Sequence, residues 1–442
     1  LASDRVEQNP QEILQSLRDV LTEIALQLGE RCQDISAAAL IVQRSSIVAI
    51  DEASGEPLSS ILSWQDTRNA QWLAKKCSDA QSWLRELTGL RANAHYGASK
   101  MRWLLDNVPA IKAAAEKNTL CITPLAGFLC RHLTGARRTV VDAVIASRTL
   151  LTELSALQWS SKLLAFFSIP NSVLPDIHAS LDNYGDIAVG NHKIPLRLVG
   201  GDQSFFVFSR SDRFLNHTVF INAGTGAFVQ QVMNAADVPM QLLSAPLMLS
   251  GSQKNSVVVA EGTVNAAATA LDWWWQQSGT VFSDKDWNEA DIDSRRAEYI
   301  VPIFINRITA TGSPDWLAAG ESYFTKEASV SLKAIAVMEA VVFALQRNMD
   351  LLTSIRPCSA IVISGGLARL DIFCQRIADL SGKTVSRSDD VEACARGAAA
   401  QLLPSVVGEQ SYQTFMPAMC EGLYERYEQW MLLINQLSSG EG

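Results

Sequence analysis

The order of apolar and polar residues predicts an amphipathic helix followed by two short strands at the start of the chain. Asn9 is a suitable helix N-cap, Pro10 fits the first helical position, and apolar residues then recur at helical intervals until Gly29. Short apolar runs at 37–43 and 46–50 follow, which are typical of strands in a sheet that helices cover. This helix therefore needs a sheet to pack on.

The rest of the chain continues this pattern in two halves. We expect a mostly helical stretch to about residue 170 and, at 217–233, a hairpin that turns at an AGTG sequence. The expected elements after it are a strand and helix over 256–277, a helix over 327–353, a strand at 359–366, a helix to about 380, a strand at 383–388 and a helix from Asp390. The sequence thus predicts an α/β protein with domains at 1–211 and 212–442.

Composition and charge exclude several classes of protein. The 442 residues carry a net charge of −9, which argues against a nucleic-acid binder or a basic membrane-surface protein. No apolar run is long enough for a membrane span, and residues 1–20 are too polar for a signal peptide, so we expect a cytoplasmic protein. The eight cysteines and five histidines show no zinc-ligand spacing. If the protein uses a metal, we expect magnesium that arrives with a nucleotide.

Asp202 is the clearest candidate for chemistry. It follows two glycines in RLVGGDQSFFVF, where the backbone allows a ligand to approach closely. A single carboxylate without a paired histidine or serine suits a general base that takes a proton from a hydroxyl, as in phosphoryl transfer to an alcohol. The alternative is that Asp202 caps the helix that follows it.

Two glycine-rich segments could contact a phosphate or nucleotide. INAGTGAFV at 221–229 can wrap a phosphate or form a plain hairpin turn, and ISGGLARL at 363–370 lies where a strand meets a helix. Neither is a dinucleotide fingerprint or a P-loop, and close packing would also explain the second.

Three further segments have both structural and functional interpretations. In SWQDTRN (63–69), a buried ion pair between Asp66 and Arg68 is at least as good an explanation as catalysis. The arginine of QRSS (43–46) is easier to explain in a cleft than in a core. We expect the WWW sequence at 273–275 to pack between elements rather than to bind a ligand.

Taken in order, these segments resemble the FGGY carbohydrate kinase family, which includes glycerol kinase and xylulokinase. Most of the chain contributes to the resemblance. The matching segments are EQNPQEI (7–13), QRSSIVAIDEASGEPLSSILSWQDTR (43–68), SKMRWLLDN (99–107), DAVIASRTLL (142–151), GGDQ (200–203), GTGAF (224–228), EGTVNAAATALDWW (261–274), GSPDW (312–316) and ISGGLARLDIFCQRIADLSGKTV (363–385).

The resemblance implies two actin-like ATPase domains of the ribonuclease H type around a central cleft. It assigns Asp202 as the base, and it implies that Arg44 and Gln203 bind substrate hydroxyls while Trp64 and Phe228 pack on the carbon skeleton. His95 stands at or beside a position that usually holds tyrosine. On the nucleotide side, the implied residues are Gly224, Thr225, Gly226, Asp272, Gly365 and Gly366.

The chain also departs from the family pattern. Ser45 stands where glycerol kinases carry glutamate, which argues against glycerol itself. Leu370 replaces an asparagine, Ala268 a glycine and Asp272 a glutamine. The family's opening hairpin, with its Gly-Thr-Thr phosphate loop, has no counterpart before Leu1, so we expect the chain as given to be close to inactive.

The resemblance implies an ATP- and Mg²⁺-dependent kinase that phosphorylates a hydroxyl of a small sugar, sugar alcohol or polyol. The alternative is a catalytically silent, sugar-sensing member of the same fold. A nucleic-acid or membrane partner is not expected, and a homodimer or homotetramer is compatible with the family.

Overall fold

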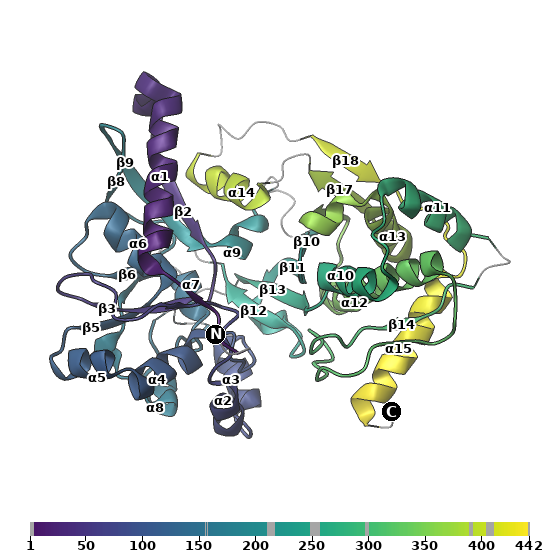
Figure 1. Ribbon diagram of the computed structural model, residues 1–442, viewed down its shortest axis with the longest axis horizontal. Helices are drawn as coiled ribbons and strands as arrows, with labels where there is room; N and C mark the ends of the chain where they lie inside the picture. Colours follow the sequence, from purple (N-terminus) through teal and green to yellow (C-terminus); the bar gives the residue numbers. More distant parts are fainter. Residues whose placement is uncertain are drawn as a thin grey trace. The chain divides into compact units, whose positions relative to one another are not determined.

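The computed structural model is a mixed α/β protein in which the chain forms two compact units (Figure 1). Its described residues are 4–154, 156, 158–209, 217–247, 257–296, 300–388, 392–403 and 411–440. Unit 1 comprises residues 1–209, 243–259 and 394–407, and unit 2 comprises residues 210–242, 260–393 and 408–442.

Unit 1 contains three small sheets. The first has the antiparallel strand order β1-β4-β3-β5, the second has the order β2-β9-β8, and β6 pairs with β7. The strands of these sheets are β1 (Glu7–Gln8), β2 (Ala38–Val42), β3 (Ile47–Asp51), β4 (Ile61–Leu62), β5 (Leu120–Pro124), β6 (Val140–Asp142), β7 (Asp176–His178), β8 (Asp186–Val189) and β9 (His192–Gly201). The residues of unit 1 also include β12 (Leu243–Pro246), which is not part of these three sheets. Strands β2 and β9 are parallel and end together, with Val42 opposite Gly201.

The helices of unit 1 include three, at residues 10–28, 125–134 and 143–147, that share one apolar core with these strands. The α-helices described in unit 1 are α1 (Pro10–Leu28), α2 (Ala70–Lys76), α3 (Gln81–Thr88), α4 (Gly97–Asn107), α5 (Pro109–Glu116), α6 (Leu125–Thr134), α7 (Ala143–Ser147), α8 (Ser161–Phe167), α9 (Asp202–Phe206) and α14 (Ala393–Leu402). The first helix is confirmed: Asn9 accepts a hydrogen bond from the Gln11 N–H, Pro10 occupies the first turn, and the helix ends at Gly29 with φ 55°.

The stretch up to residue 170 is less helical than its pattern predicts. It contains β4, β5 and β6, and β5 is the buried run LCITP. A short apolar run without alternation looks the same in a buried strand and in a buried helix, so periodicity alone cannot separate them.

Unit 2 is built around a mixed sheet in which neighbouring strands follow the order β13-β11-β10-β16-β17-β18. Strands β10, β16 and β17 are parallel, whereas β11 pairs antiparallel with β10 and β18 pairs antiparallel with β17. The strands are β10 (Thr218–Ala223), β11 (Ala227–Asn234), β13 (Val257–Val264), β14 (Phe304–Ile305), β15 (Tyr323–Phe324), β16 (Ala360–Ser364), β17 (Thr384–Ser388) and β18 (Tyr412–Phe415). The predicted hairpin at 217–233 is therefore confirmed as β10 and β11.

Five α-helices are described in unit 2: α10 (Ala268–Ser278), α11 (Asp284–Ser294), α12 (Val330–Ile355), α13 (Asp371–Ser381) and α15 (Leu423–Ser439). Helix α12 is buried along much of its length, which agrees with its apolar sequence. The three tryptophans pack as expected; Trp273 stacks on Phe304 at 5.3 Å, and Trp274 contacts Phe324 edge-on at 5.2 Å. The helix expected from Asp390 is observed from Ala393, and residues 389–391 lie outside the described part.

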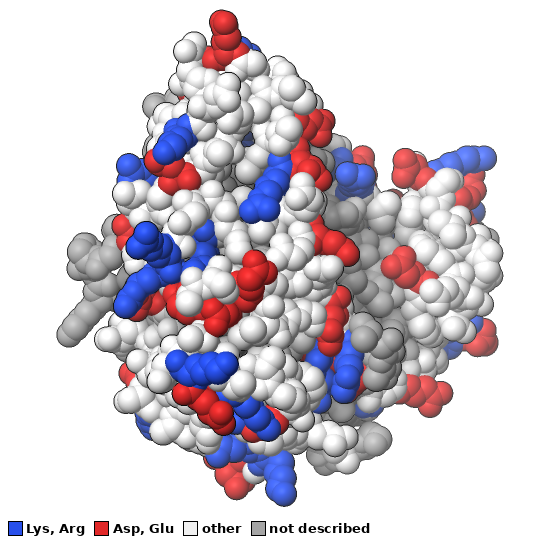
Figure 2. Space-filling view, turned by 60° about the vertical axis from the view of Figure 1, so that its left-hand side comes forward, with Lys and Arg blue, Asp and Glu red and all other residues white. Residues whose placement is uncertain are grey.

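The surface mixes charges of both signs. On the face in Figure 2, basic and acidic side chains are interspersed. Among the described residues, no helix combines the length and apolarity that a membrane span requires.

Candidate active site

Asp202 stands at the junction of β9 and α9, where a glycine pair ends the strand. A Cβ at Gly201 would lie 2.5 Å from Cγ of Arg44, and a Cβ at Gly200 would lie 2.6 Å from the ring of Phe205. Only glycine fits such close approaches. The sequence thus brings the stem of Arg44 directly against the backbone that carries Asp202.

The carboxylate of Asp202 remains accessible. Its side chain is 46% exposed, and Oδ1 lies 3.9 Å from Nε of Arg44, whose own side chain is 6% exposed. Oδ1 also accepts a 2.8 Å hydrogen bond from the backbone N–H of Gln203. Asp202 is the first residue of α9, the cap position belongs to Gly201, and no side chain caps this helix. This arrangement differs from the helix-capping alternative.

Trp64 and His95 meet on unit 1. Their rings contact edge-on, with centroids 5.4 Å apart and planes inclined by 63°. The backbone N–H of Trp64 donates a 3.1 Å hydrogen bond to Oγ of Ser46, and the residue is 39% exposed. The pair thus offers an aromatic edge that a carbon skeleton could contact.

Ser45 connects the loop after β2 to a second buried arginine. Its φ of 67° places the residue in the left-handed region, and its Oγ donates a 3.5 Å hydrogen bond to the backbone carbonyl of Arg148. The guanidinium of Arg148 lies 5.2 Å from the centre of the Tyr96 ring, and that ring contacts His95 edge-on. One chain of contacts therefore leads from Ser45 to the aromatic pair.

Asp66 and Arg68 form the expected buried ion pair. Arg68 Nη2 lies 2.6 Å from Oδ2 of Asp66 and 2.6 Å from Oε1 of Glu7. Burial would raise the pKa of Asp66, but hydrogen bonds from Arg68 and from the Val6 N–H outweigh burial and leave this pKa below its usual value. The pair ties β1 to the loop after β4, which favours the structural interpretation.

The sequence pattern does not single out Lys100, which lies beside the aromatic pair. Its Nζ donates hydrogen bonds to the backbone carbonyls of Ala94, at 2.8 Å, and His95, at 2.6 Å. The side chain lies within α4 and is 1% exposed. A lysine in an amphipathic helix is normally expected at the surface. The only signal in the sequence is that Lys100 stands four residues before Leu104, and therefore on the same, buried face of α4.

The glycine-rich segments of unit 2 meet at one edge of its sheet. Parallel pairing places Asn222 opposite Ser364, so the turn after β10 and the loop after β16 start side by side. Gly365 has φ 97°, and a Cβ there would clash with the carbonyl of Ala223. At Gly366, by contrast, a Cβ would meet open space. The carboxyl edge of parallel strands is where α/β folds commonly bind ligands.

Main-chain hydrogen bonds fasten the turn after β10 to the start of α10. The N–H of Ala267 donates to the carbonyl of Thr225 at 3.0 Å, and the N–H of Ala268 donates to the carbonyl of Gly224 at 3.0 Å. Thr225 and Asp272 are exposed, and Asp272 lies one turn into α10. The two segments with which the resemblance associates the nucleotide are thus adjacent in unit 2.

Gly226 and Phe228, the remaining predicted site residues, lie in unit 2. Gly226 ends the turn, with its Cβ position 3.0 Å from the carbonyl of Val264. Phe228 lies on β11 of unit 2, half-buried and opposite Asn222, whereas the other predicted sugar contacts lie in unit 1. In the described part of the chain, histidine, cysteine and carboxylate side chains form no group of three that could hold a metal ion.

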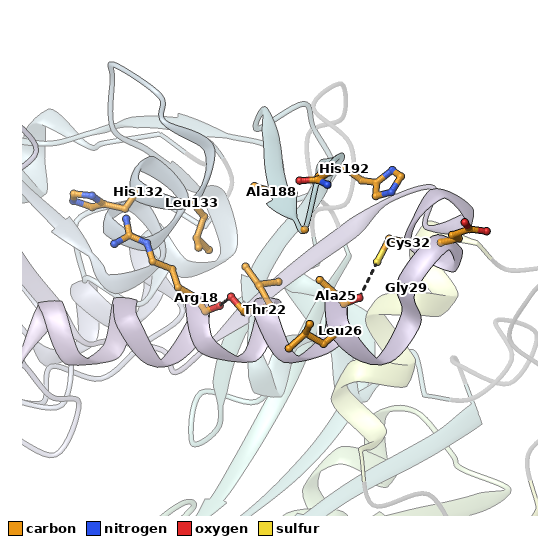
Figure 3. Close-up of a pocket in the computed structure, with 14 residues that line it drawn as sticks. Arg18, Thr22, Ala25, Leu26, Gly29, Cys32, His132, Leu133, Ala188 and His192 are labelled. Atoms are coloured by element: carbon orange, nitrogen blue, oxygen red, sulfur yellow. Dashed lines mark hydrogen bonds between the residues drawn. The ribbon is translucent and has the colours of Figure 1, made fainter.

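An open cavity of about 830 Å³ lies away from these residues, between α1, α6 and the β8–β9 hairpin (Figure 3). Arg18, Leu26, His132 and His192 belong to its wall, and Cys32 Sγ lies 3.8 Å from the carbonyl of Ala25. None of the predicted site residues lines it.

Comparison with known proteins identifies the class. Residues 2–209 match the N-terminal domain of the FGGY family of carbohydrate kinases, and residues 219–403 match its C-terminal domain. The chain therefore belongs to this family, and it is a carbohydrate kinase that transfers phosphate to an alcohol group.

Individual relatives and solved structures support the same family. The chain is 30% identical to a glycerol kinase of Bordetella parapertussis over 98% of its own length and 89% of the relative's, and 30% identical to one of Rhodopirellula baltica over 89% and 74%. Its fold matches a crystal structure of Plasmodium falciparum glycerol kinase with ADP, with a TM-score of 0.86, 21% identity and coverage of 99% and 91%. A ligand-bound xylulose kinase of Lactobacillus acidophilus matches with a TM-score of 0.83, 17% identity and coverage of 100% and 91%.

Proposed function

We propose that this protein phosphorylates a hydroxyl of a small sugar, sugar alcohol or polyol with ATP, and that Asp202 is the general base. In this proposal residues 1–211 carry most of the sugar site, and residues 212–442 carry the nucleotide site. The observation that supports the base most directly is the exposed carboxylate of Asp202 at a glycine-lined strand end, with Arg44 Nε 3.9 Å away.

The proposed mechanism uses the properties of these side chains. Asp202 accepts the proton of the attacking hydroxyl, whose oxygen then displaces ADP from the terminal phosphate in line. Arg44 and Gln203 orient the substrate by binding its hydroxyls, and Ser45 lies beside them. Trp64, His95 and Phe228 contact its carbon atoms. Positioning of the two reactants supplies most of the rate enhancement in such transfers.

The nucleotide would bind at the edge of the unit 2 sheet where the two glycine-rich segments meet. Gly224, Thr225 and Gly226 would face the phosphates, because a turn with two glycines lets an anion approach the backbone closely. Gly365 and Gly366 would lie under the adenosine, where the open space at the Cβ position of Gly366 leaves room. Asp272 would contact the nucleotide from α10.

Magnesium would enter with the nucleotide. It would neutralise charge on the phosphate oxygens when bound. Phosphate oxygens and water would supply most of its ligands, as is usual for Mg²⁺ that binds together with a nucleotide.

The decisive experiment compares the wild type with Asp202→Asn in a coupled ADP-release screen across three- to seven-carbon polyols and ketoses. Asp202→Asn should keep sugar affinity, measured by calorimetry, and lose about 10²- to 10⁴-fold or more in turnover. Asp186→Asn, an exposed residue at the start of β8, is the matched control and should behave as the wild type. Near-normal turnover of Asp202→Asn would contradict the role of the base. Sugar binding by the wild type without ATP binding and without sugar-dependent turnover would favour a sugar sensor.

A further inference from the structure

Lys100 is a buried cation whose hydrogen bonds point to one short segment. Its Nζ donates to two consecutive backbone carbonyls, those of Ala94 and His95, at 2.8 and 2.6 Å. The carbonyl of Ala94 also accepts a hydrogen bond from Oγ of Ser99, at 3.4 Å. The start of α4 thus holds the segment before it through side chains on two successive residues.

The segment that Lys100 holds carries the aromatic edge of unit 1. The His95 N–H donates to Oδ1 of Asn93 at 2.9 Å, which closes a tight turn at the same place. The imidazole of His95 contacts the indole of Trp64, with centroids 5.4 Å apart, and the ring of Tyr96 at 5.2 Å. A shift of this backbone would therefore move the imidazole relative to Trp64.

Burying an ammonium at this place costs free energy, which argues for a specific role. Burial lowers the pKa of Lys100 to about 7; the charge of Asp66 opposes this shift, and that of Arg68 adds to it. The Asp66 carboxylate is itself engaged by Arg68. An apolar side chain such as methionine would fill the same space without this cost but could not bind the two carbonyls.

We propose that Lys100 is a positioning residue for the sugar site: its ammonium holds the carbonyls of Ala94 and His95 and so fixes the imidazole of His95 against Trp64. The proposal rests on the proposed function, because that function makes Trp64 and His95 sugar contacts. Lys100 itself does not touch the substrate. It acts through the backbone of residue 95.

The kinetic test replaces Lys100 by methionine, which matches the length of the side chain but removes its donor. Lys100→Met should raise KM for the sugar roughly tenfold to hundredfold, because a misplacement of about 1 Å has effects of this size. The turnover number and KM for ATP should stay within about twofold of the wild type, since only uniform binding of the sugar is lost. Lys112→Met, an exposed lysine on α5, is the control and should leave all three values unchanged. Equal sugar KM values for Lys100→Met and wild type would overturn the proposal.

A second measurement tests the positioning without requiring activity. The protein has five histidines, so its ¹³C-labelled imidazole signals can be resolved and the signal of His95 assigned with His95→Gln. In Lys100→Met the His95 signal should shift or broaden while the signals of His178, His192 and His217 stay in place. An unmoved His95 signal would also overturn the proposal. If Lys100→Met does not fold, Lys100→Gln, which keeps a shorter donor, is measured in the same way with the same criteria.

The two measurements separate this proposal from the function on which it rests. A wild-type protein that phosphorylates no sugar and binds no ATP contradicts the proposed function, and the His95 signal then still decides whether Lys100 positions the imidazole. An active wild type with unchanged sugar KM in Lys100→Met contradicts the positioning role alone.

Discussion

The guanidinium of Arg44 faces the carboxylate of Asp202 across 3.9 Å, although one side chain is buried and the other is about half exposed. The stem of Arg44 is held because it packs on Gly201, where no Cβ intervenes. The charge of Arg44 is therefore fixed in place, while Asp202 stays accessible to a substrate. In a partly buried setting such a fixed cation acts more strongly than it would in water.

Removing this charge should weaken catalysis without unfolding the protein. Arg44→Met keeps the apolar stem against Gly201 and should lower kcat/KM for the sugar about 10²-fold, because a hydrogen-bonded charged contact to the substrate is lost. Steady-state kinetics with the coupled ADP assay measures this, and circular dichroism checks the fold. Arg197 is exposed on β9, the strand that leads to Asp202, and Arg197→Met should leave kcat/KM unchanged. The role of Arg44 would be refuted by a kcat/KM within twofold of the wild type.

Two neighbouring glycines should respond differently to the same substitution. Gly365→Ala forces a Cβ against the carbonyl of Ala223 at φ 97°, so it should lower the free energy of unfolding by about 1–3 kcal/mol. Gly366→Ala meets open space, and we expect stability close to that of the wild type but a raised KM for ATP, since the added methyl enters the proposed adenosine site. Urea denaturation and ATP titration together distinguish the two effects. A Gly365→Ala variant as stable as the wild type would contradict the predicted clash with Ala223. An unchanged KM for ATP in Gly366→Ala would contradict the proposed adenosine site.

Lys100 should make stability depend on pH. Its pKa falls from 10.5 in the unfolded chain to about 7 in the folded protein, so between these values the unfolded chain binds more protons. The free energy of unfolding should therefore increase as the pH rises through this window. Lys100 should contribute at most about 1.4 kcal/mol per pH unit to this increase.

The comparison with a variant isolates this contribution. Urea denaturation of the wild type and Lys100→Met from pH 6.5 to 9.5 should show the wild type gaining stability relative to the variant. The effects of Asp66, Arg68 and the buried cysteines largely cancel in the difference. The free energy of unfolding of Lys112→Met should change with pH in the same way as that of the wild type. A constant difference between wild type and Lys100→Met would mean that Lys100 titrates as it does in water.

Local signals in the sequence predict much of the fold but not the contacts of buried charges. Asn9, Pro10 and Gly29 define α1 because capping and chain reversal depend on the residue itself. The run LCITP is ambiguous, since burial on both sides removes the alternation that would mark a strand. The grouping of 243–259 and 394–407 with residues 1–209 arises from tertiary contacts that no local pattern encodes.

The candidate site shows the same limit. The sequence alone indicates the glycines around Asp202 and the AGTG turn, because a close approach to the backbone requires glycine. Lys100 and Arg148 do not, because a cation in a helical or loop segment is normally solvated, and only the folded structure shows which carbonyls or rings surround it. A family resemblance assigns roles to matching residues, but it says little about the side chains that hold those residues in place.

The turn after β10 is fastened to α10 by backbone atoms of Gly224, Thr225, Ala267 and Ala268. Such a connection does not depend on which side chains these positions carry, provided that the backbone can reach the same conformation. The start of α10 can therefore accept substitutions, such as Ala268 for the family's glycine, without loss of its link to the turn after β10.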